Sequence, residues 1–285
     1  MIFIFLLMRT AVIAGGNSGI GKAVAIALAK QGFRVIIHGR DKEKTIQATE
    51  EIKTISKSPT VEYLVADIVD IVGMKSLAQA IKEKTDSIEA LVLSTGVILP
   101  KHIMTSDGLE AGFAIQYLSR FVLTQLLMPE LKKGHAKIVL VGAPKMGNAR
   151  IFFDDIALKN NFSMIKAMGQ EMFANHLFVQ EFAKRHPGKE VVMNMAHVGI
   201  AKTGIMRHSN FLLKMLMAIA GKSPEAAAAN FVYLASASTV DFSGYFLKKP
   251  GHTDVKEKIL YDEKTAEKLW NMSMELAKLK AAPQA

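Results

Sequence analysis

A glycine-rich run near the start of the chain constrains its fold more than any other segment. Ala14-Gly15-Gly16-Asn17-Ser18-Gly19-Ile20-Gly21 follows a β-branched, apolar stretch at 9–14 and precedes an alanine-rich helical pattern at 20–30. A buried strand, a tight turn and a helix in this order are typical of the first unit of a parallel sheet. The glycines let the backbone approach a pyrophosphate, which the free N–H groups of the helix can bind. This context favours a dinucleotide-binding turn over an ordinary strand-to-helix turn.

The end of the second predicted strand bears on the choice of cofactor. This strand, at 33–38, is followed by Gly39-Arg40. An acidic residue at this place would accept hydrogen bonds from the ribose hydroxyls of NAD, whereas the guanidinium of Arg40 suits a 2′-phosphate. We therefore expect NADP(H) to be preferred over NAD(H). The alternative is that Arg40 only begins a solvated loop with Asp41 and Lys42.

Composition limits the function classes. A chain of 285 residues with 50% hydrophobic content can bury one large core, and no repeat or linker marks a boundary. Cysteine is absent, which excludes thiol catalysis, and the eight histidines are scattered, so no metal site is expected. The net charge is +10, but basic residues are spread among acidic neighbours without an aromatic-basic stripe. We expect no nucleic-acid partner; an anionic cofactor, an anionic lipid or simple solubility accounts for the charge.

The first residues are very apolar but short. Residues 1–7 would span only about a third of a bilayer core as a helix, and they lack a charged leader. We expect residues 1–8 to be an extension, with Met8 as a natural start, and residues 9–285 to be the domain. A cytoplasmic location is expected, and association with a membrane surface through this extension remains the alternative.

Strands and helices alternate along the rest of the chain. Further strands are expected at 61–65, 90–93, 137–141 and 190–194, with long helices at 108–131 and 161–185. This pattern predicts a Rossmann-type, doubly wound parallel α/β sheet that binds ligands at the carboxyl ends of its strands. The stretch 200–222 contains an apolar segment at 211–219 that is too short to cross a bilayer. We expect it to cover a lipophilic ligand; a membrane-surface contact or a homo-oligomer contact is left open.

From Met8 almost to its end, the chain resembles the short-chain dehydrogenase/reductase family, and within it the retinol-dehydrogenase-like branch. The resemblance rests on the first turn, the Gly39-Arg40 tip and Asp67-Ile68. It also rests on the segments Thr105–Glu110, Gly169-Gln170, Ala174-Asn175, Leu177-Phe178, Ser243–Phe246 and Lys268–Trp270. It implies a seven-stranded parallel sheet and hydride transfer between NADP(H) and an alcohol/carbonyl pair of a hydrophobic small molecule.

The resemblance also implies a set of cofactor contacts. Asp67 and Ile68 stand at a usual adenine-contact position, and Thr203 matches a position near the nicotinamide amide. The loop after the fourth strand, usually Asn-Asn-Ala-Gly, reads Leu93-Ser94-Thr95-Gly96. The expected contacts are therefore Gly15, Asn17, Ser18, Gly19, Ile20, Gly21, Arg40, Asp67, Ile68, Ser94, Gly96 and Thr203.

The departures from the family pattern fall on the chemistry. Family members use a serine after the fifth strand and a Tyr-x-x-x-Lys pair on the next helix as a proton relay. Here the serine position holds Ala143, and Met168 and Met172 hold the other two, four residues apart and so on one helical face. Gln116 replaces a helper asparagine on the preceding helix. None of the four classical catalytic groups is expected to be present.

An alternative register does not restore the relay. Phe162 and Lys166 have the required spacing, but the aromatic ring has no hydroxyl and the shift loses the matches at 169–178. Positioned proton transfer contributes about 10²–10⁴-fold to a rate. We therefore expect an atypical NADP(H)-dependent oxidoreductase for a hydrophobic carbonyl or alcohol, with classical catalysis absent or strongly impaired. The alternative is a non-catalytic NADP(H)-binding sensor or interaction protein, a pseudoenzyme.

Other polar residues near the expected site are interpreted more simply. Lys145 and Glu171 are expected to be solvated side chains rather than a replacement acid. Tyr117 follows Gln116 on a predicted helix and is expected to pack in the core. Asp154 and Asp155 are expected to be surface groups.

Overall fold

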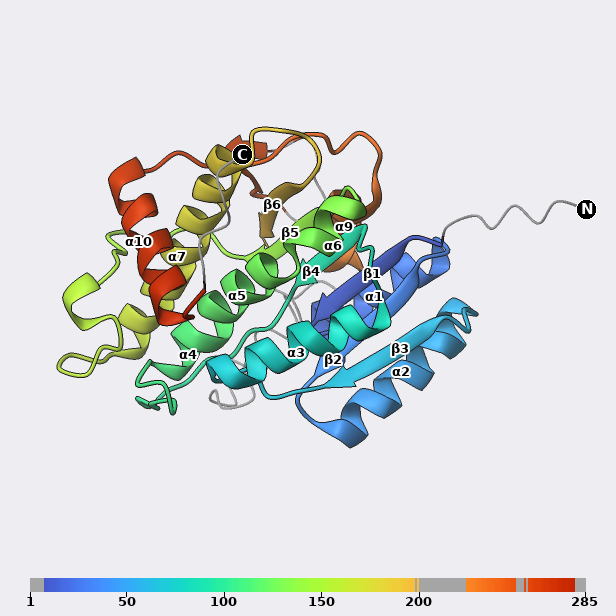
Figure 1. The fold of residues 1–285 in the computed structure, drawn as a ribbon, viewed down its shortest axis with the longest axis horizontal. Helices are drawn as coiled ribbons and strands as arrows, with labels where there is room; N and C mark the ends of the chain where they lie inside the picture. The colour runs from blue at the N-terminus through green and yellow to red at the C-terminus, as the bar shows by residue number, and fades with distance from the viewer. Residues whose placement is uncertain (1–7, 198, 200–223, 250–253, 255, 280–285) are drawn as a thin grey trace, which may run out of the picture.

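One eight-stranded sheet forms the centre of the computed structural model, which describes residues 8–197, 199, 224–249, 254 and 256–279 (Figure 1). The strand order is β3-β2-β1-β4-β5-β6-β7-β8. The strands are β1 (Thr10–Ala14), β2 (Arg34–Gly39), β3 (Val61–Val65), β4 (Ala90–Leu93), β5 (Lys137–Gly142), β6 (Val192–His197), β7 (Tyr245–Leu247) and β8 (Lys256–Lys258). All neighbouring strands are parallel except β7 and β8. The predicted doubly wound α/β sheet is confirmed, and the antiparallel β8 is an addition that the sequence did not predict.

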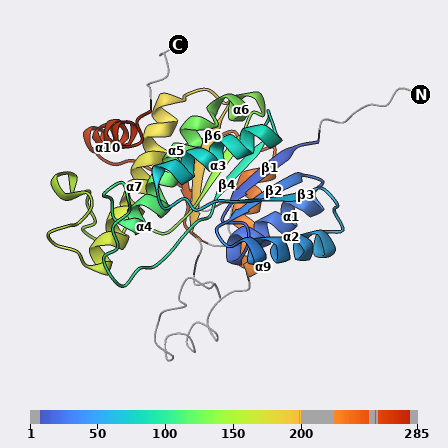
Figure 2. The ribbon, with the colours of Figure 1, turned by 60° about the horizontal axis from the view of Figure 1, so that its bottom comes forward.

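Helices cover both faces of the sheet, because successive side chains of its central strands point to opposite sides. On β1, Ala11 and Ile13 belong to one core cluster, whereas Val12 and Ala14 belong to the other. The first cluster is covered by α1 (Gly19–Lys30), α2 (Lys42–Ser56) and α9 (Pro224–Ser236). The second is covered by α3 (Ile71–Lys84), α5 (Ser119–Leu126) and α7 (Met164–Arg185). A further helix, α10 (Glu263–Leu276), packs against α7 (Figure 2).

The helix predicted at 108–131 is interrupted, which corrects the sequence interpretation. The structure has α4 (Ala111–Phe113), a π-helical turn η1 (Ala114–Leu118), then α5 and α6 (Met128–Lys133). Two side chains bind the backbone here: Asn175 Nδ2, from α7, donates to the Gln116 carbonyl at 3.0 Å, and Ser119 Oγ, within the same helical segment, donates to the Ile115 carbonyl at 2.6 Å. These bonds compete with the regular helical ladder, so the interruption has an identifiable cause.

Two smaller differences concern the chain on either side of α7. The strand predicted at 190–194 begins two residues later, as β6, and extends to His197. A short 3₁₀ turn, η2 (Phe153–Asp155), precedes α7. Asp155 accepts hydrogen bonds from the backbone N–H groups of Lys159 and Asn160. It therefore closes a surface turn, in keeping with the predicted surface role.

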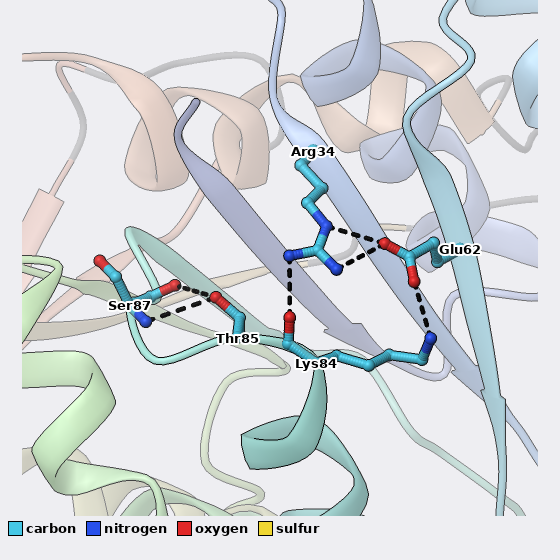
Figure 3. A network of polar contacts seen from close by, with 5 residues as sticks. All are labelled: Arg34, Glu62, Lys84, Thr85 and Ser87. Carbon is cyan, nitrogen blue, oxygen red and sulfur yellow. Dashed lines mark hydrogen bonds and ion pairs between the residues drawn. The ribbon is translucent and has the colours of Figure 1, made fainter. Parts of the chain in front are cut away.

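A charged network joins β2, β3 and the end of α3 at the amino ends of the strands, opposite the ends that carry the cavity (Figure 3). Arg34 Nε donates to Glu62 Oε1 at 2.7 Å, and Lys84 Nζ donates to Glu62 Oε2 at 2.7 Å. Arg34 also donates to the Lys84 carbonyl at 2.9 Å. Burial alone would raise the pKa of the Glu62 carboxyl, but the hydrogen bonds from Lys84 and Arg34 hold it below its ordinary value.

Three sequence interpretations fall on residues for which the structure gives no placement. The apolar extension at 1–7, the predicted cover at 200–222 and Thr203 within it lie outside the described residues. In the part of the chain that is described, no helix has the length and apolar character needed to cross a membrane.

Candidate functional site

The carboxyl ends of the central strands open on a cavity of about 590 Å³. Its lining runs from the end of β2 across the turn after β1 to β5 and α7. It brings together every described residue that the sequence assigned to the cofactor: Gly15, Asn17, Ser18, Gly19, Ile20, Gly21, Arg40, Asp67, Ile68, Ser94 and Gly96. It also contains Gln116, Ala143, Met168 and Met172, the four positions at which the sequence predicts that the family's catalytic groups are replaced. These residues therefore line one continuous cavity.

The turn after β1 needs its glycines for space as well as for backbone conformation. Gly15 has φ +82°, and a Cβ there would lie 2.9 Å from the Thr95 backbone nitrogen. A Cβ on Gly21 would lie 2.2 Å from the Gly15 carbonyl oxygen. Ser94 Oγ donates to the Ala14 carbonyl at 2.7 Å and so holds the turn from the β4 side. The backbone of the turn is thus left open toward the cavity without a side chain in the way.

The first turn of α1 differs from those of α2, α3 and α10. Asp41, Asp70 and Asp262 cap α2, α3 and α10 by accepting hydrogen bonds from their backbone N–H groups. Ser18, at the corresponding position of α1, makes no such bond, and the first turn of α1 contains no acidic residue. Because the start of α1 lines the cavity, its N–H groups and positive dipole end are available to an anion there.

Two basic side chains border the cavity after β2. Arg40, which the sequence singled out, is exposed, and Lys44, which it did not, is half-buried in the first turn of α2. Asp41 lines the cavity between them, but its carboxylate accepts a hydrogen bond from the Lys44 backbone nitrogen at 3.0 Å. Across from them, Asp67 is exposed and Ile68 is buried. The position of Lys44, four residues after Arg40 and in the first turn of the helix that follows, is the signal that could have identified it.

The opposite end of the cavity, near β5 and α7, is largely apolar. Met168 and Met172 are half-buried on the same wall, and Ala143 brings no hydroxyl to it. The Ala143 carbonyl instead bonds to His176 Nε2 at 2.9 Å, which ties the loop after β5 to α7. Among the described residues lining this end, none is a tyrosine or a lysine.

Glu171 is the largest departure from the sequence interpretation of this region. It was expected to be solvated, but it is 5% exposed and lines the cavity beside Met172. Gln116 Nε2 donates to Glu171 Oε2 and also to the Val97 carbonyl, the latter at 2.8 Å. Burial raises the pKa of the Glu171 carboxyl to about 9, and repulsion by Glu110 acts in the same direction. The carboxyl is therefore protonated near neutral pH.

Arg120 was missed altogether. It is 4% exposed on α5, and it donates to the carbonyls of Thr95 and Val141 at 2.8 and 2.9 Å and to Asn175 Oδ1 at 3.0 Å. Burial lowers the pKa of Arg120 to about 10, so the guanidinium remains charged at neutral pH. It holds the ends of β4 and β5 against α7. A lone cation within the stretch 117–123, whose other residues are hydrophobic apart from Ser119, is the signal that could have revealed it.

Two further expectations have opposite outcomes. Tyr117 is packed in the core as expected, with its hydroxyl 2.7 Å from Ser273 Oγ on α10, and burial raises the pKa of this phenol. Lys145 is half-buried rather than fully solvated, because its ammonium lies 4.7 Å from the centre of the Phe173 ring. Within the described residues, no group of three His, Asp or Glu side chains is arranged to hold a metal ion.

Known proteins resemble the chain along nearly its whole length. The family model described as short chain dehydrogenase matches residues 9–152. "Retinol dehydrogenase 13" of Homo sapiens is 31% identical over 287 residues, which cover 96% of this chain and 86% of that protein. "Polyprenol dehydrogenase" of Homo sapiens is 28% identical over 280 residues, which cover 94% and 84%.

Solved structures share the fold. An uncharacterized protein from Mycobacterium paratuberculosis superposes with a TM-score of 0.72 at 24% identity, covering 95% of this chain and 94% of its own. The RhlG/NADP active-site complex from Pseudomonas aeruginosa superposes with a TM-score of 0.69 at 23% identity, covering 89% and 99%. At these identities the superpositions establish the common architecture alone.

Proposed function

Because the chain belongs to the short-chain dehydrogenase/reductase family, in its retinol-dehydrogenase-like branch, we propose that it is an atypical NADP(H)-dependent oxidoreductase for a hydrophobic carbonyl or alcohol. The observation that carries the proposal is the continuity of one cavity. It joins the uncapped start of α1 and two cations at one end to an apolar wall at the other. The first features suit a phosphate-bearing dinucleotide, and the second suits an apolar substrate.

The residues present fit such a cofactor at its phosphate end. The glycine turn leaves room where a Cβ would meet backbone, and the first turn of α1 offers N–H donors to the pyrophosphate. Arg40 and Lys44 would hold a 2′-phosphate, and Asp67 and Ile68 would contact the adenine. Ser94 and Gly96 would border the cofactor from the loop after β4. When bound, the nicotinamide would supply or accept the hydride.

The wall around Met168 and Met172 favours an apolar substrate. Methionine side chains are flexible and polarizable, and so adapt to an irregular hydrophobic ligand. Two relatives are named for long apolar alcohols, retinol and polyprenol. We therefore infer a substrate whose carbonyl or alcohol carbon lies near α7, with an apolar chain extending from it.

The chemistry would be slow in comparison with that of a family member with its relay intact. Without a serine hydroxyl, a phenol and an ammonium, the site lacks the family's relay, in which positioned proton transfer contributes about 10²–10⁴-fold. Holding the two reactants in contact still contributes a large factor of its own. Turnover at a reduced rate is the expected outcome.

Two measurements test the proposal. A titration of NADPH fluorescence is expected to give micromolar binding, with NADH clearly weaker. Single-turnover reactions with excess protein, NADPH and either retinal or a long-chain aldehyde are expected to consume the cofactor at least a hundredfold more slowly than a relative with the full relay. Absence of NADPH binding, or a preference for NADH, would contradict the cofactor assignment.

A second candidate is a non-catalytic NADP(H)-binding sensor or interaction protein. It is favoured by one observation, the replacement of the three relay groups by Ala143, Met168 and Met172 on the cavity wall. Micromolar NADPH binding without any transfer of hydride to the aldehydes would favour this candidate over the first.

A further inference from the structure

One ionisable group at the apolar end of the cavity, Glu171, has no role in the proposed function. Glu171 precedes Met172 on α7, lines the cavity and is 5% exposed. A carboxyl group is costly to bury among apolar side chains unless it has a partner or remains neutral. Its position therefore needs an explanation beyond solubility or packing.

The surroundings of Glu171 fix its carboxyl group in place. Gln116 donates to Oε2 from η1, and the Val97 carbonyl anchors the same Gln116 nitrogen. Glu171 Oε1 packs against Gly112: a Cβ added to this glycine would lie 2.1 Å from that oxygen. Glu110 Oε2 lies 3.0 Å from that same Cβ position, so the two carboxyl groups are close neighbours. A residue larger than glycine at 112 would displace the group.

The charges around Glu171 decide which form it takes. Glu110 lies just before α4 and is engaged by the backbone N–H groups of Gly112 and Phe113, at 2.9 and 2.7 Å. Arg120 on α5 opposes it with a positive charge, but gives its hydrogen bonds to Thr95, Val141 and Asn175. Desolvation and Glu110 together outweigh Arg120, and the pKa of Glu171 rises to about 9. Glu171 therefore carries an exchangeable proton at neutral pH.

Other titratable groups that line the described part of the cavity are less suited to exchange a proton at this end. His38, Arg40, Asp41, Lys44 and Asp67 lie at or beyond the ends of β2 and β3. Arg120 remains a cation at neutral pH. Glu171 shares the wall with Met168 and Met172, where the family has its phenol and ammonium.

We propose that Glu171 exchanges the proton that accompanies hydride transfer in this cavity. In the direction of reduction, the substrate's carbonyl carbon accepts the hydride of the reduced nicotinamide, and its oxygen accepts the proton of the Glu171 carboxyl. The carbonyl is thereby reduced to an alcohol, the nicotinamide is oxidised, and Glu171 is left as a carboxylate near Arg120 until water returns the proton. A neutral carboxylic acid kept in an apolar site is a known form of proton or hydrogen-bond donor. This inference rests on the proposed function.

The first test does not depend on turnover. The positive charge of oxidised nicotinamide near Glu171 must favour the carboxylate, so NADP⁺ binding at pH 8 is expected to release protons and NADPH binding much less. Calorimetry in two buffers of different ionisation enthalpy measures the difference. Glu171→Gln is expected to abolish it while binding both cofactors. Glu181→Gln is the matched control, since Glu181 is a buried carboxylate on the same helix that pairs with Arg185 and does not line the cavity.

The second test measures transfer itself. Reduction of retinal or a long-chain aldehyde in single turnover is expected to slow as the pH rises through about 9, because only the protonated carboxyl can donate. Glu171→Gln is expected to lower the rate about 10²-fold or more and to lose this pH dependence, whereas Glu181→Gln retains both. Glu171→Asp, which keeps an acid, is expected to recover part of the rate.

The outcomes of these two tests distinguish failure of the Glu171 proposal from failure of the proposed function. Equal proton release in wild type and Glu171→Gln, or an unchanged rate and pH profile in Glu171→Gln, would overturn the proposal. Release that depends on Glu171, without reduction of either aldehyde, would show an exchangeable proton beside the ring, but it would refute the proposed reduction and with it a role for Glu171 in hydride transfer. If the wild-type protein does not bind NADPH, both the Glu171 proposal and the proposed function are refuted.

Discussion

Replacing Arg40 with alanine is the sharpest test of cofactor choice. Arg40 is exposed at the end of β2 and borders the cavity with Lys44. NADPH and NADH differ only in the 2′-phosphate, so a residue that binds this group must affect one cofactor and leave the other unchanged. We expect Arg40→Ala to weaken NADPH binding selectively.

The magnitude follows from the exposure of the side chain. A hydrogen bond between charged groups contributes about 1.5–3 kcal/mol, and exposure to solvent reduces ion pairs toward the lower limit. Lys44 is half-buried and remains as a second cation. We therefore expect Arg40→Ala to lose about 1.4 kcal/mol of NADPH binding free energy, which corresponds to a tenfold higher dissociation constant. The double variant Arg40→Ala/Lys44→Ala is expected to lose about a hundredfold if the two side chains act independently.

The assay is the same fluorescence titration with both reduced cofactors, performed at low and at high salt. The salt dependence of NADPH binding is expected to shrink in each variant, because fewer charges face the phosphate. Lys42→Ala is a useful control, as Lys42 is exposed nearby but does not line the cavity. If Arg40→Ala weakens NADPH and NADH equally, or weakens neither, Arg40 is not a 2′-phosphate ligand.

Three further predictions concern the relay, the core and the charged network around Glu62. The triple variant Ala143→Ser/Met168→Tyr/Met172→Lys is expected to raise kcat for aldehyde reduction by about 10²–10⁴-fold, and an unchanged kcat would mean that more than the relay is missing. Trp270→Ala is expected to cost about 3–5 kcal/mol of unfolding free energy in urea, since the 6% exposed indole lies 5.0 Å, centre to centre, from Phe121. Glu62, whose pKa is lowered, contributes stability above its unfolded pKa that is lost as the pH falls through the folded one. The melting temperature of Glu62→Gln should therefore approach that of wild type in acid; a gap that stays constant from pH 7 to 3 would refute this.

The features that the sequence predicted correctly are those governed by local chemistry. The turn at 14–21 combines a β-branched strand, glycines and an alanine-rich helix, and each has a direct backbone consequence. The position of Met168 and Met172 on the cavity wall follows from their four-residue spacing on one helix. The position of Arg40 at the mouth of the cavity follows from its place directly after a buried strand.

The features that were missed depend on contacts between distant segments. Glu171 looks like a solvated residue in the sequence, and only the packing of α7 against α4 and η1 buries it. The break in the predicted helix at 108–131 follows from bonds that Asn175 makes across 59 residues. β8 pairs with β7 through only three residues, too few for a strand pattern to be recognised.

The polar groups behind the apolar wall hold the Glu171 carboxyl in place. In place of the lysine position at 172, the ionisable group stands at 171, which is rotated by about 100° around the helix. There it meets the half-buried Gln116, while the buried Arg120 meets Asn175, so each of these side chains has a partner from another segment. A buried carboxyl without a hydrogen-bond partner would carry its desolvation penalty in full, even in the neutral form. The hydrogen bond from Gln116 offsets part of this penalty and holds the Glu171 carboxyl on the cavity wall, which is the position that the proposed proton exchange requires.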